Sequence, residues 1–156
     1  MDQESSRVDT LINALVVDDS TTLRRLMELL LVPLGFAIDF VDTGERAVEL
    51  SKRKNYDIVF LDILLPGIDG YRVCKLLKGD KRTKTTRVVM LTSKDSTIDK
   101  VRGMMAGTDV YLTKPVDRID LIRAIDKCLP RVEFSRRVYP TTGARGHDFS
   151  TVSRSR

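Results

Sequence analysis

Five side chains that can take part in chemistry each follow a short apolar segment of this chain. They are Asp18, Asp19, Asp62, Thr92 and Lys114. Residues that end the strands of an open, parallel α/β sheet meet at its carboxyl edge, where such sheets bind their ligands. Each of them alone has an ordinary explanation, since an aspartate can cap a helix and a lysine is usually a solvated charge. Their joint pattern favours one shared site.

The chemistry that these residues favour is phosphoryl transfer assisted by a metal ion. Three neighbouring carboxylates repel one another and need a cation, and a site of carboxylates and water suits Mg²⁺. Asp62 is then the nucleophile that forms an acyl phosphate, while the metal and Lys114 neutralise the developing charge. Thr92 offers a hydroxyl to a phosphoryl oxygen, and the small Ser93 leaves space for the group.

The elements that must position this site are short strands that alternate with helices. Ile58 to Leu61 is an uninterrupted apolar run of the kind that is buried on both faces of a parallel sheet. The other strands are expected at 11–17, 36–41, 88–91 and 110–112, and the helices between them show apolar residues at spacings of three and four. We therefore predict an α/β fold, a doubly wound five-stranded parallel sheet with helices on both faces.

Composition and charge set the domain organisation. With 156 residues and 42% hydrophobic content, the chain suits one domain, predicted at 11–130, between a disordered lead at 1–10 and a tail at 131–156. No run of about eighteen apolar residues and no secretory signal pattern is present, so we expect a cytoplasmic protein without a membrane span. Cys74 and Cys128 lack metal-ligand spacing and are predicted to be reduced core residues.

The motifs around the predicted site resemble a known family. They are Asp18-Asp19, then Asp62-x-x-x-Pro-Gly-x-Asp-Gly, then Thr92-Ser93, then Tyr111-x-x-Lys114-Pro115. This order resembles the CheY-like receiver domain of two-component response regulators. The resemblance implies the flavodoxin-like strand order 2-1-3-4-5. It also implies that Asp62 accepts phosphate from a histidine kinase or a phosphotransfer protein.

The same resemblance implies further roles. Asp18, Asp19, Asp62 and the Leu64 backbone carbonyl would surround Mg²⁺, and Lys114 would pair with the phosphoryl group, before a cis Lys114–Pro115 bond. Tyr111 occupies the position of the family's aromatic switch, although it could also be ordinary core filler. An enzyme function would rest on self-dephosphorylation alone, so we do not expect an enzyme.

The tail carries most of the formal net charge of +5. Residues 131–156 hold six arginines, no lysine and two carboxylates, a net charge of +4 that leaves +1 for residues 1–130. Arginine's planar fork can bind guanine edges or phosphates in pairs and can stack on bases, which lysine cannot do. The tail is too short and too polar to form a domain of its own.

A short tail motif resembles that of PilZ-type cyclic di-GMP receptors, with serine in place of the final glycine. It is Asp148-x-Ser150-x-x-Ser153, preceded by Arg136-Arg137. A receiver with such an extension resembles the CheY-like cyclic di-GMP effectors called the Cle group. The resemblance implies a tail that orders around the dinucleotide and then contacts the flagellar motor switch or other motility or adhesion machinery. The predicted ligand-binding residues are Arg136, Arg137, Arg145, Asp148, Ser150, Ser153, Arg154 and Arg156.

Two alternatives remain open at this point. The chain could be an ordinary phosphorelay, chemotaxis or twitching-type receiver whose tail is non-functional or binds polyanions without specificity. Binding of nucleic acid is a weaker alternative, because a net charge of +1 over residues 1–130 predicts no basic face on the receiver, and arginines outside a folded module give mainly salt-sensitive affinity.

Overall fold

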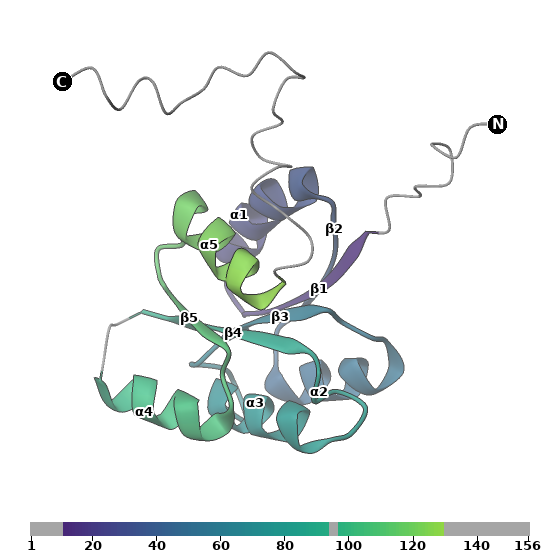
Figure 1. Cartoon of the computed structure of the whole chain (residues 1–156), viewed down its shortest axis with the longest axis vertical. Coiled ribbons are helices and arrows are strands. Elements are labelled where there is room, and N and C mark those ends of the chain that lie inside the picture. The colour runs from purple at the N-terminus through teal and green to yellow at the C-terminus, as the bar shows by residue number, and fades with distance from the viewer. Residues whose placement is uncertain (1–10, 94–96, 130–156) are drawn as a thin grey trace, which may run out of the picture.

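A single parallel sheet between two layers of helices makes up the part of the chain that the computed structural model describes, residues 11–93 and 97–129 (Figure 1). The sheet order is β2-β1-β3-β4-β5. Its strands are β1 (Ile12–Val17), β2 (Phe36–Val41), β3 (Ile58–Asp62), β4 (Arg87–Thr92) and β5 (Val110–Thr113). The helices are α1 (Thr21–Leu31), α2 (Gly44–Arg53), α3 (Gly70–Gly79), α4 (Thr97–Ala106) and α5 (Arg118–Cys128), with a 3₁₀ turn, η2 (Val32–Leu34). The predicted fold class and strand order are confirmed.

Each face of the sheet is covered by its own set of helices. Figure 1 shows α1 and α5 on one side and α2, α3 and α4 on the other. Along β3, Phe60 packs in the cluster that includes α1 and α5, whereas Leu61 packs in the cluster that includes α2 and α3, and both are fully buried. This double burial explains why β3 is an apolar run rather than an alternating pattern. Cys74 and Cys128 are buried, free thiols, as predicted.

The helix starts depend on side-chain caps that the sequence makes recognisable. Asp117 caps α5, because its side chain accepts hydrogen bonds from the backbone N–H groups of Ile119 and Asp120, at 3.0 and 3.3 Å. Ser20, Thr43 and Asp69 cap α1, α2 and α3 in the same way. These caps fix where each chain segment leaves the carboxyl edge of the sheet.

Three predictions concern a membrane span, the lead at residues 1–10 and the tail at residues 131–156. None of the helices within residues 11–93 and 97–129 combines the length and the apolar character needed to cross a bilayer. The predicted lead, residues 1–10, and the predicted tail, residues 131–156, lie outside the described residues.

Candidate phosphoacceptor site

The register of the sheet brings the predicted site residues to one edge. Val17 pairs with Leu61, so Asp18 and Asp62 come next to each other at the ends of two adjacent strands. Thr92 pairs with Thr113, and the backbone N–H of Lys114 donates to the Thr92 carbonyl at 2.7 Å. Four strand ends therefore contribute to a single site, as the strand pattern predicted.

The centre of the site is an acidic cluster with one cation. Asp18 is fully buried, Asp62 is 7% exposed and Asp19 is exposed. One carboxylate oxygen from each of them lies within 4.8 Å of the others. The Lys114 Nζ lies 2.9 Å from Asp18 Oδ2 and 2.9 Å from Asp62 Oδ2. Three carboxylates against one ammonium leave an excess of negative charge on oxygen donors, which fits a hard divalent cation such as Mg²⁺.

Backbone groups hold the two buried carboxylates in place. Asp18 Oδ1 accepts a hydrogen bond from the N–H of Ser20 at 2.7 Å, and Asp62 Oδ1 accepts one from the N–H of Leu64 at 3.1 Å. The Nε of Arg24 donates to the carbonyl of Asp18 at 3.0 Å. Each carboxylate thus has one oxygen fixed by its own turn and the other directed to Lys114.

The protonation equilibria reflect this crowding. Burial raises the pKa of the Asp62 carboxyl, the hydrogen bond from Lys114 opposes that rise, and the charge of Asp18 adds to it. Burial by itself lowers the pKa of the Lys114 ammonium, but its hydrogen bonds to Asp18 and Asp62 outweigh burial and leave the pKa raised. The site therefore favours positive charge, which is what a metal ion supplies.

The remaining predicted receiver residues lie around this centre. Thr92 is 6% exposed at the end of β4, and the Lys114–Pro115 peptide bond is cis, as expected. Tyr111 is half-buried and packs against the cluster on the side of α2, α3 and α4. The side chain of Leu64 is 73% exposed. The Asp62, Thr92 and Lys114 positions are thus brought to the same end of the sheet, whereas Tyr111 pairs with Met90, two residues before that end of β4.

The predicted tail site has no counterpart in the described structure. The residues concerned lie outside the described residues: Arg136, Arg137, Arg145, Asp148, Ser150, Ser153, Arg154 and Arg156.

One residue that supports the site was missed from the sequence. Glu45, in the first turn of α2, accepts a hydrogen bond at Oε1 from the N–H of Ile68 at 2.9 Å, and so holds the loop that follows Asp62. In that loop Gly67 has a φ of 79°, a conformation that favours glycine. The glycine was a visible turn signal, but nothing in the sequence near Glu45 links it to residues more than twenty positions later.

Comparison with known proteins gives a consistent result. Residues 14–126 match the response regulator receiver domain. Protein PilG of Pseudomonas aeruginosa is 38% identical over 130 residues, which cover 83% of this chain and 93% of PilG. The chain spans about half the length of other curated relatives, 48% and 53% in two cases.

Solved structures agree with this match. A putative response regulator from Chloroflexus aurantiacus is similar with a TM-score of 0.75 and 34% identity, over 78% of this chain and all of that one. The receiver domain of the sensor histidine kinase PA1611 from Pseudomonas aeruginosa, solved with a magnesium ion in its active-site cleft, has a TM-score of 0.70 and 27% identity, over 76% of this chain and 97% of that one.

Proposed function

Since this chain belongs to the response regulator receiver family, we propose that it is a signalling protein whose Asp62 accepts a phosphoryl group from a histidine kinase or a phosphotransfer protein. One observation carries the proposal: the Lys114 ammonium lies 2.9 Å from both Asp18 and Asp62 within a cluster of three carboxylates. An isolated buried aspartate would need only one partner. A cluster with an acidic excess is suited to a metal ion and a phosphoryl group together.

The transfer step uses residues of one edge of the sheet. A carboxylate oxygen of Asp62 attacks phosphorus, the phosphorus–nitrogen bond of the donor phosphohistidine breaks, and its electron pair stays on the histidine. Asp18, Asp19, Asp62 and the Leu64 carbonyl would hold Mg²⁺, which supplies charge neutralisation at the phosphoryl oxygens. Lys114 exchanges its contact with Asp62 for a phosphoryl oxygen, and the Thr92 hydroxyl donates to another.

The output of this step would pass through Tyr111. Movement of the Thr92 hydroxyl towards a phosphoryl oxygen frees space beside β4 and lets the half-buried ring of Tyr111 turn inward. Because Tyr111 lies on β5, this would change the surface that β5 forms with the neighbouring α4. A partner that binds this surface would then distinguish the phosphorylated chain from the unphosphorylated one. The proposed place of this signalling is the cytoplasm, where the kinase domain is available.

The phosphoacceptor is tested by labelling with acetyl phosphate and Mg²⁺, followed by phosphate-affinity electrophoresis. The wild-type chain should shift, and Asp62→Asn should not. Asp57→Asn is the matched control, because Asp57 directly precedes β3 at the opposite end of the same strand. Labelling of Asp62→Asn to the wild-type level would show that the nucleophile is another residue.

We further propose that residues 131–156 bind cyclic di-GMP and direct the receiver to motility or adhesion machinery, such as the flagellar motor switch. The support is the sequence of this segment, whose six cations are all arginine and surround Asp148. Calorimetric titration of the full chain with cyclic di-GMP should give saturable heat that is lost in Arg136→Gln/Arg137→Gln. Arg118→Gln/Arg123→Gln, on the exposed side of α5, is the control with the same charge change. Equal heats from all three chains would contradict cyclic di-GMP binding by these arginines and would favour the alternative of an ordinary phosphorelay receiver.

A further inference from the structure

A dense run of positive charge lies on the receiver, at the end of α3 and in the loop that leads to β4. Residues 75–87 contain six lysines and arginines and one carboxylate, a net charge of +5. The net charge of +1 over residues 1–130 led us to expect no basic face, and that expectation is wrong. The net charge of residues 1–130 is small because acidic residues outside the 75–87 run, some of them at the carboxyl edge of the sheet, offset its positive charge.

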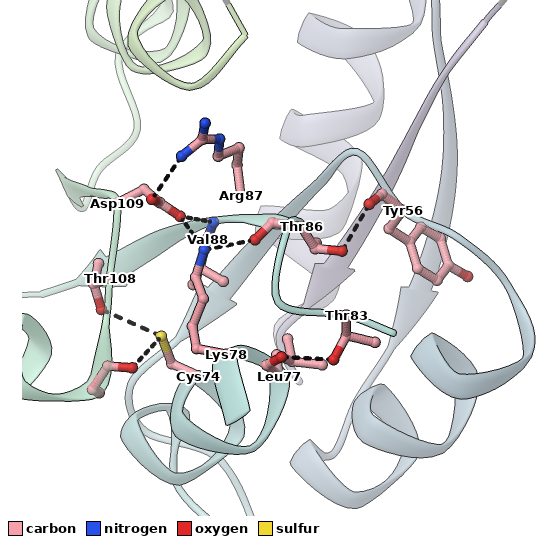
Figure 2. A network of polar contacts seen from close by, with 11 residues as sticks. Tyr56, Cys74, Leu77, Lys78, Thr83, Thr86, Arg87, Val88, Thr108 and Asp109 are labelled. Atoms are coloured by element: carbon pink, nitrogen blue, oxygen red, sulfur yellow. Dashed lines mark hydrogen bonds and ion pairs between the residues drawn. The ribbon is translucent and has the colours of Figure 1, made fainter. Parts of the chain in front are cut away.

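The loop that carries these charges is fixed by buried hydrogen bonds. Figure 2 shows Thr83 donating to the carbonyl of Leu77 and Thr86 donating to the carbonyl of Tyr56, at 2.6 and 2.9 Å. Both threonines are buried, at 4% and 8% exposed. The Nζ of Lys78 adds a bond to the Thr86 carbonyl at 2.8 Å. The cations of this loop are therefore presented from a held backbone, which lowers the ordering entropy that binding would cost.

Part of the charge in this region has no partner on the described chain. Lys78 and Arg87 both pair with Asp109, and Arg82 pairs with Asp80. The other three cations of the run make no ion pair within residues 11–93 and 97–129 and are exposed, as is Lys52 on the neighbouring α2: they are Lys75, Lys81 and Lys84. Unpaired lysines that gather around one helix create a positive potential that attracts anions.

Exposed cations line two hollows, one on each side of α3. One, of about 580 Å³, lies between α2, α3 and the loop, and Lys52, Leu76 and Lys81 are among its lining residues. The other, of about 410 Å³, lies between α3 and α4, and Arg102 and Met105 are among its lining residues. Lys75 lines both. We call the two hollows together the α3 groove.

The lining of the α3 groove favours a peptide over a nucleic acid. Apolar side chains lie among the charged ones: Val48, Leu76 and Leu77 line the first hollow, and Met105 and Ala106 line the second. The described lining of each hollow also has one carboxylate, and both carboxylates are paired with arginines: Asp80 with Arg82 and Asp69 with Arg102. Proteins that bind single-stranded nucleic acid without sequence preference combine a basic groove with exposed aromatic rings on which the bases stack. Among the described residues that line the groove, the one aromatic is Tyr71; it is 7% exposed, and its ring is covered by the Arg102 guanidinium at 4.5 Å.

From these observations we propose that the α3 groove docks an acidic segment of a partner protein that also carries apolar side chains. Its carboxylates pair with Lys52, Lys75 and Lys81, and its apolar side chains contact Val48, Leu76 and Met105. The groove runs along α3 and reaches Asp69 at its N-terminus, but the described residues that line it do not include the acidic cluster of Asp18, Asp19 and Asp62. Docking there requires no phosphoryl group on Asp62.

The test uses fluorescence anisotropy with a labelled sixteen-residue peptide of alternating glutamate and leucine. The full-length chain carries Arg→Gln at its six tail positions, so that tail arginines do not bind the probe: Arg131, Arg136, Arg137, Arg145, Arg154 and Arg156. In this background, Lys75→Glu/Lys81→Glu should raise Kd about tenfold or more, the factor expected from reversing two exposed charges that contact the ligand. The milder Lys75→Gln/Lys81→Gln should weaken binding in the same direction.

Two further measurements make the proposal falsifiable. Arg123→Glu/Lys127→Glu reverses two exposed charges on α5, on the other face of the sheet, and should change Kd less than about twofold, as expected for charges that do not contact the ligand. An equal loss in this control would mean that only net charge matters and would overturn the proposal. A single-stranded oligonucleotide of the same charge should bind more weakly than the peptide. If it binds more tightly, and the α3-groove variants abolish that binding, the site is one for nucleic acid and the peptide assignment is wrong.

Discussion

Replacing Lys114 by methionine tests the charge balance of the phosphoacceptor site. The substitution removes an ammonium that donates to two carboxylates at 2.9 Å, of which the Asp18 side chain is fully buried and the Asp62 side chain is 11% exposed. Breaking a buried ion pair from one side costs about 3–5 kcal/mol. Because the Lys114 side chain is itself 25% exposed, water reaches part of the site, and we expect a loss of about 3 kcal/mol at pH 8 without divalent cations.

Magnesium should reverse most of this loss. A cation bound among Asp18, Asp19 and Asp62 replaces the missing positive charge, and a ligand at about 100 times its Kd adds about 2.7 kcal/mol to the free energy of unfolding. The Lys114→Met chain should bind Mg²⁺ more tightly than the wild type, because one competing cation has gone. Because Mg²⁺ stabilises both chains, only the ratio of their Kd values narrows the difference. A Kd about thirtyfold lower in the variant is worth about 2 kcal/mol and would leave a difference of about 1 kcal/mol in saturating Mg²⁺.

Acidic pH should narrow the same difference by another route. Burial already raises the pKa of Asp62 above its value in the unfolded chain, and the lowering effect of Lys114 is absent in the variant. Ionised Asp62 therefore destabilises the folded variant at pH values above its folded pKa. As pH falls through that pKa towards the unfolded value of about 4, the carboxyl becomes neutral and the stability is regained.

Urea denaturation measures all three quantities when it is done at pH 8 with EDTA, at pH 8 with Mg²⁺, and at acidic pH with EDTA. At an m-value of about 1.5 kcal/mol/M, a loss of 3 kcal/mol lowers the midpoint by about 2 M. Lys127→Met, an exposed lysine on α5, is the control and should change little in either condition. If Lys114→Met matches the wild type in EDTA, or gains no more from Mg²⁺ than Lys127→Met does, then Lys114 does not balance the charge of the cluster.

Two further predictions concern the framework. Asp109→Ala should lower the free energy of unfolding by about 2–3 kcal/mol, since it removes acceptors for Lys78 and for the Val88 N–H, both at 2.8 Å. Asp80→Ala, in an exposed pair, should leave the free energy of unfolding nearly unchanged, and equal losses in urea denaturation would contradict this. Gly70→Ala should lower the free energy of unfolding by about 3 kcal/mol, because a Cβ there meets the Asp62 carbonyl. The control Gly79→Ala, with open space at its Cβ, should change this free energy by no more than about 1 kcal/mol. Thermal melts measure both, and a Gly70→Ala chain as stable as the wild type would refute the contact.

The carboxyl edge could be predicted from sequence because its signals are local. Ile58 to Leu61 is apolar without interruption, and Asp62 ends it, so the strand and its functional end are visible within five residues. A parallel sheet then brings all strand ends of the same polarity together, whatever their separation along the chain. The contact of Lys114 with Asp62, over fifty positions apart, follows from topology rather than from any signal that links the two.

Side-chain details that do not follow from the order of strand ends could not be predicted from the sequence. Glu45 holds the loop at Ile68, but a glutamate in the first turn of a helix is equally typical of a favourable position for the helix dipole. Ile119 lies three residues before Ile122 and so fits the apolar stripe of the last helix, yet it is 55% exposed, because it lies in the first turn of α5, beyond the cluster that Leu121, Ile122 and Ile125 form with the sheet. Periodicity predicts a face, but not how far the neighbouring layer extends over it.

The error about the basic face has a physical cause in the topology of α3. This helix follows β3, so its first turn, capped by Asp69, lies at the carboxyl edge beside the acidic cluster, and its last turn leads to the amino end of β4. Anions are favourable at a helix N-terminus and cations at its C-terminus, where Lys78 lies. A charge sum over residues 1–130 cancels these two ends against each other, although they are separated by the length of the helix. Reversal of Lys75 should therefore leave the labelling of Asp62 intact, while neutralisation of Asp62 should leave the α3 groove able to bind its peptide.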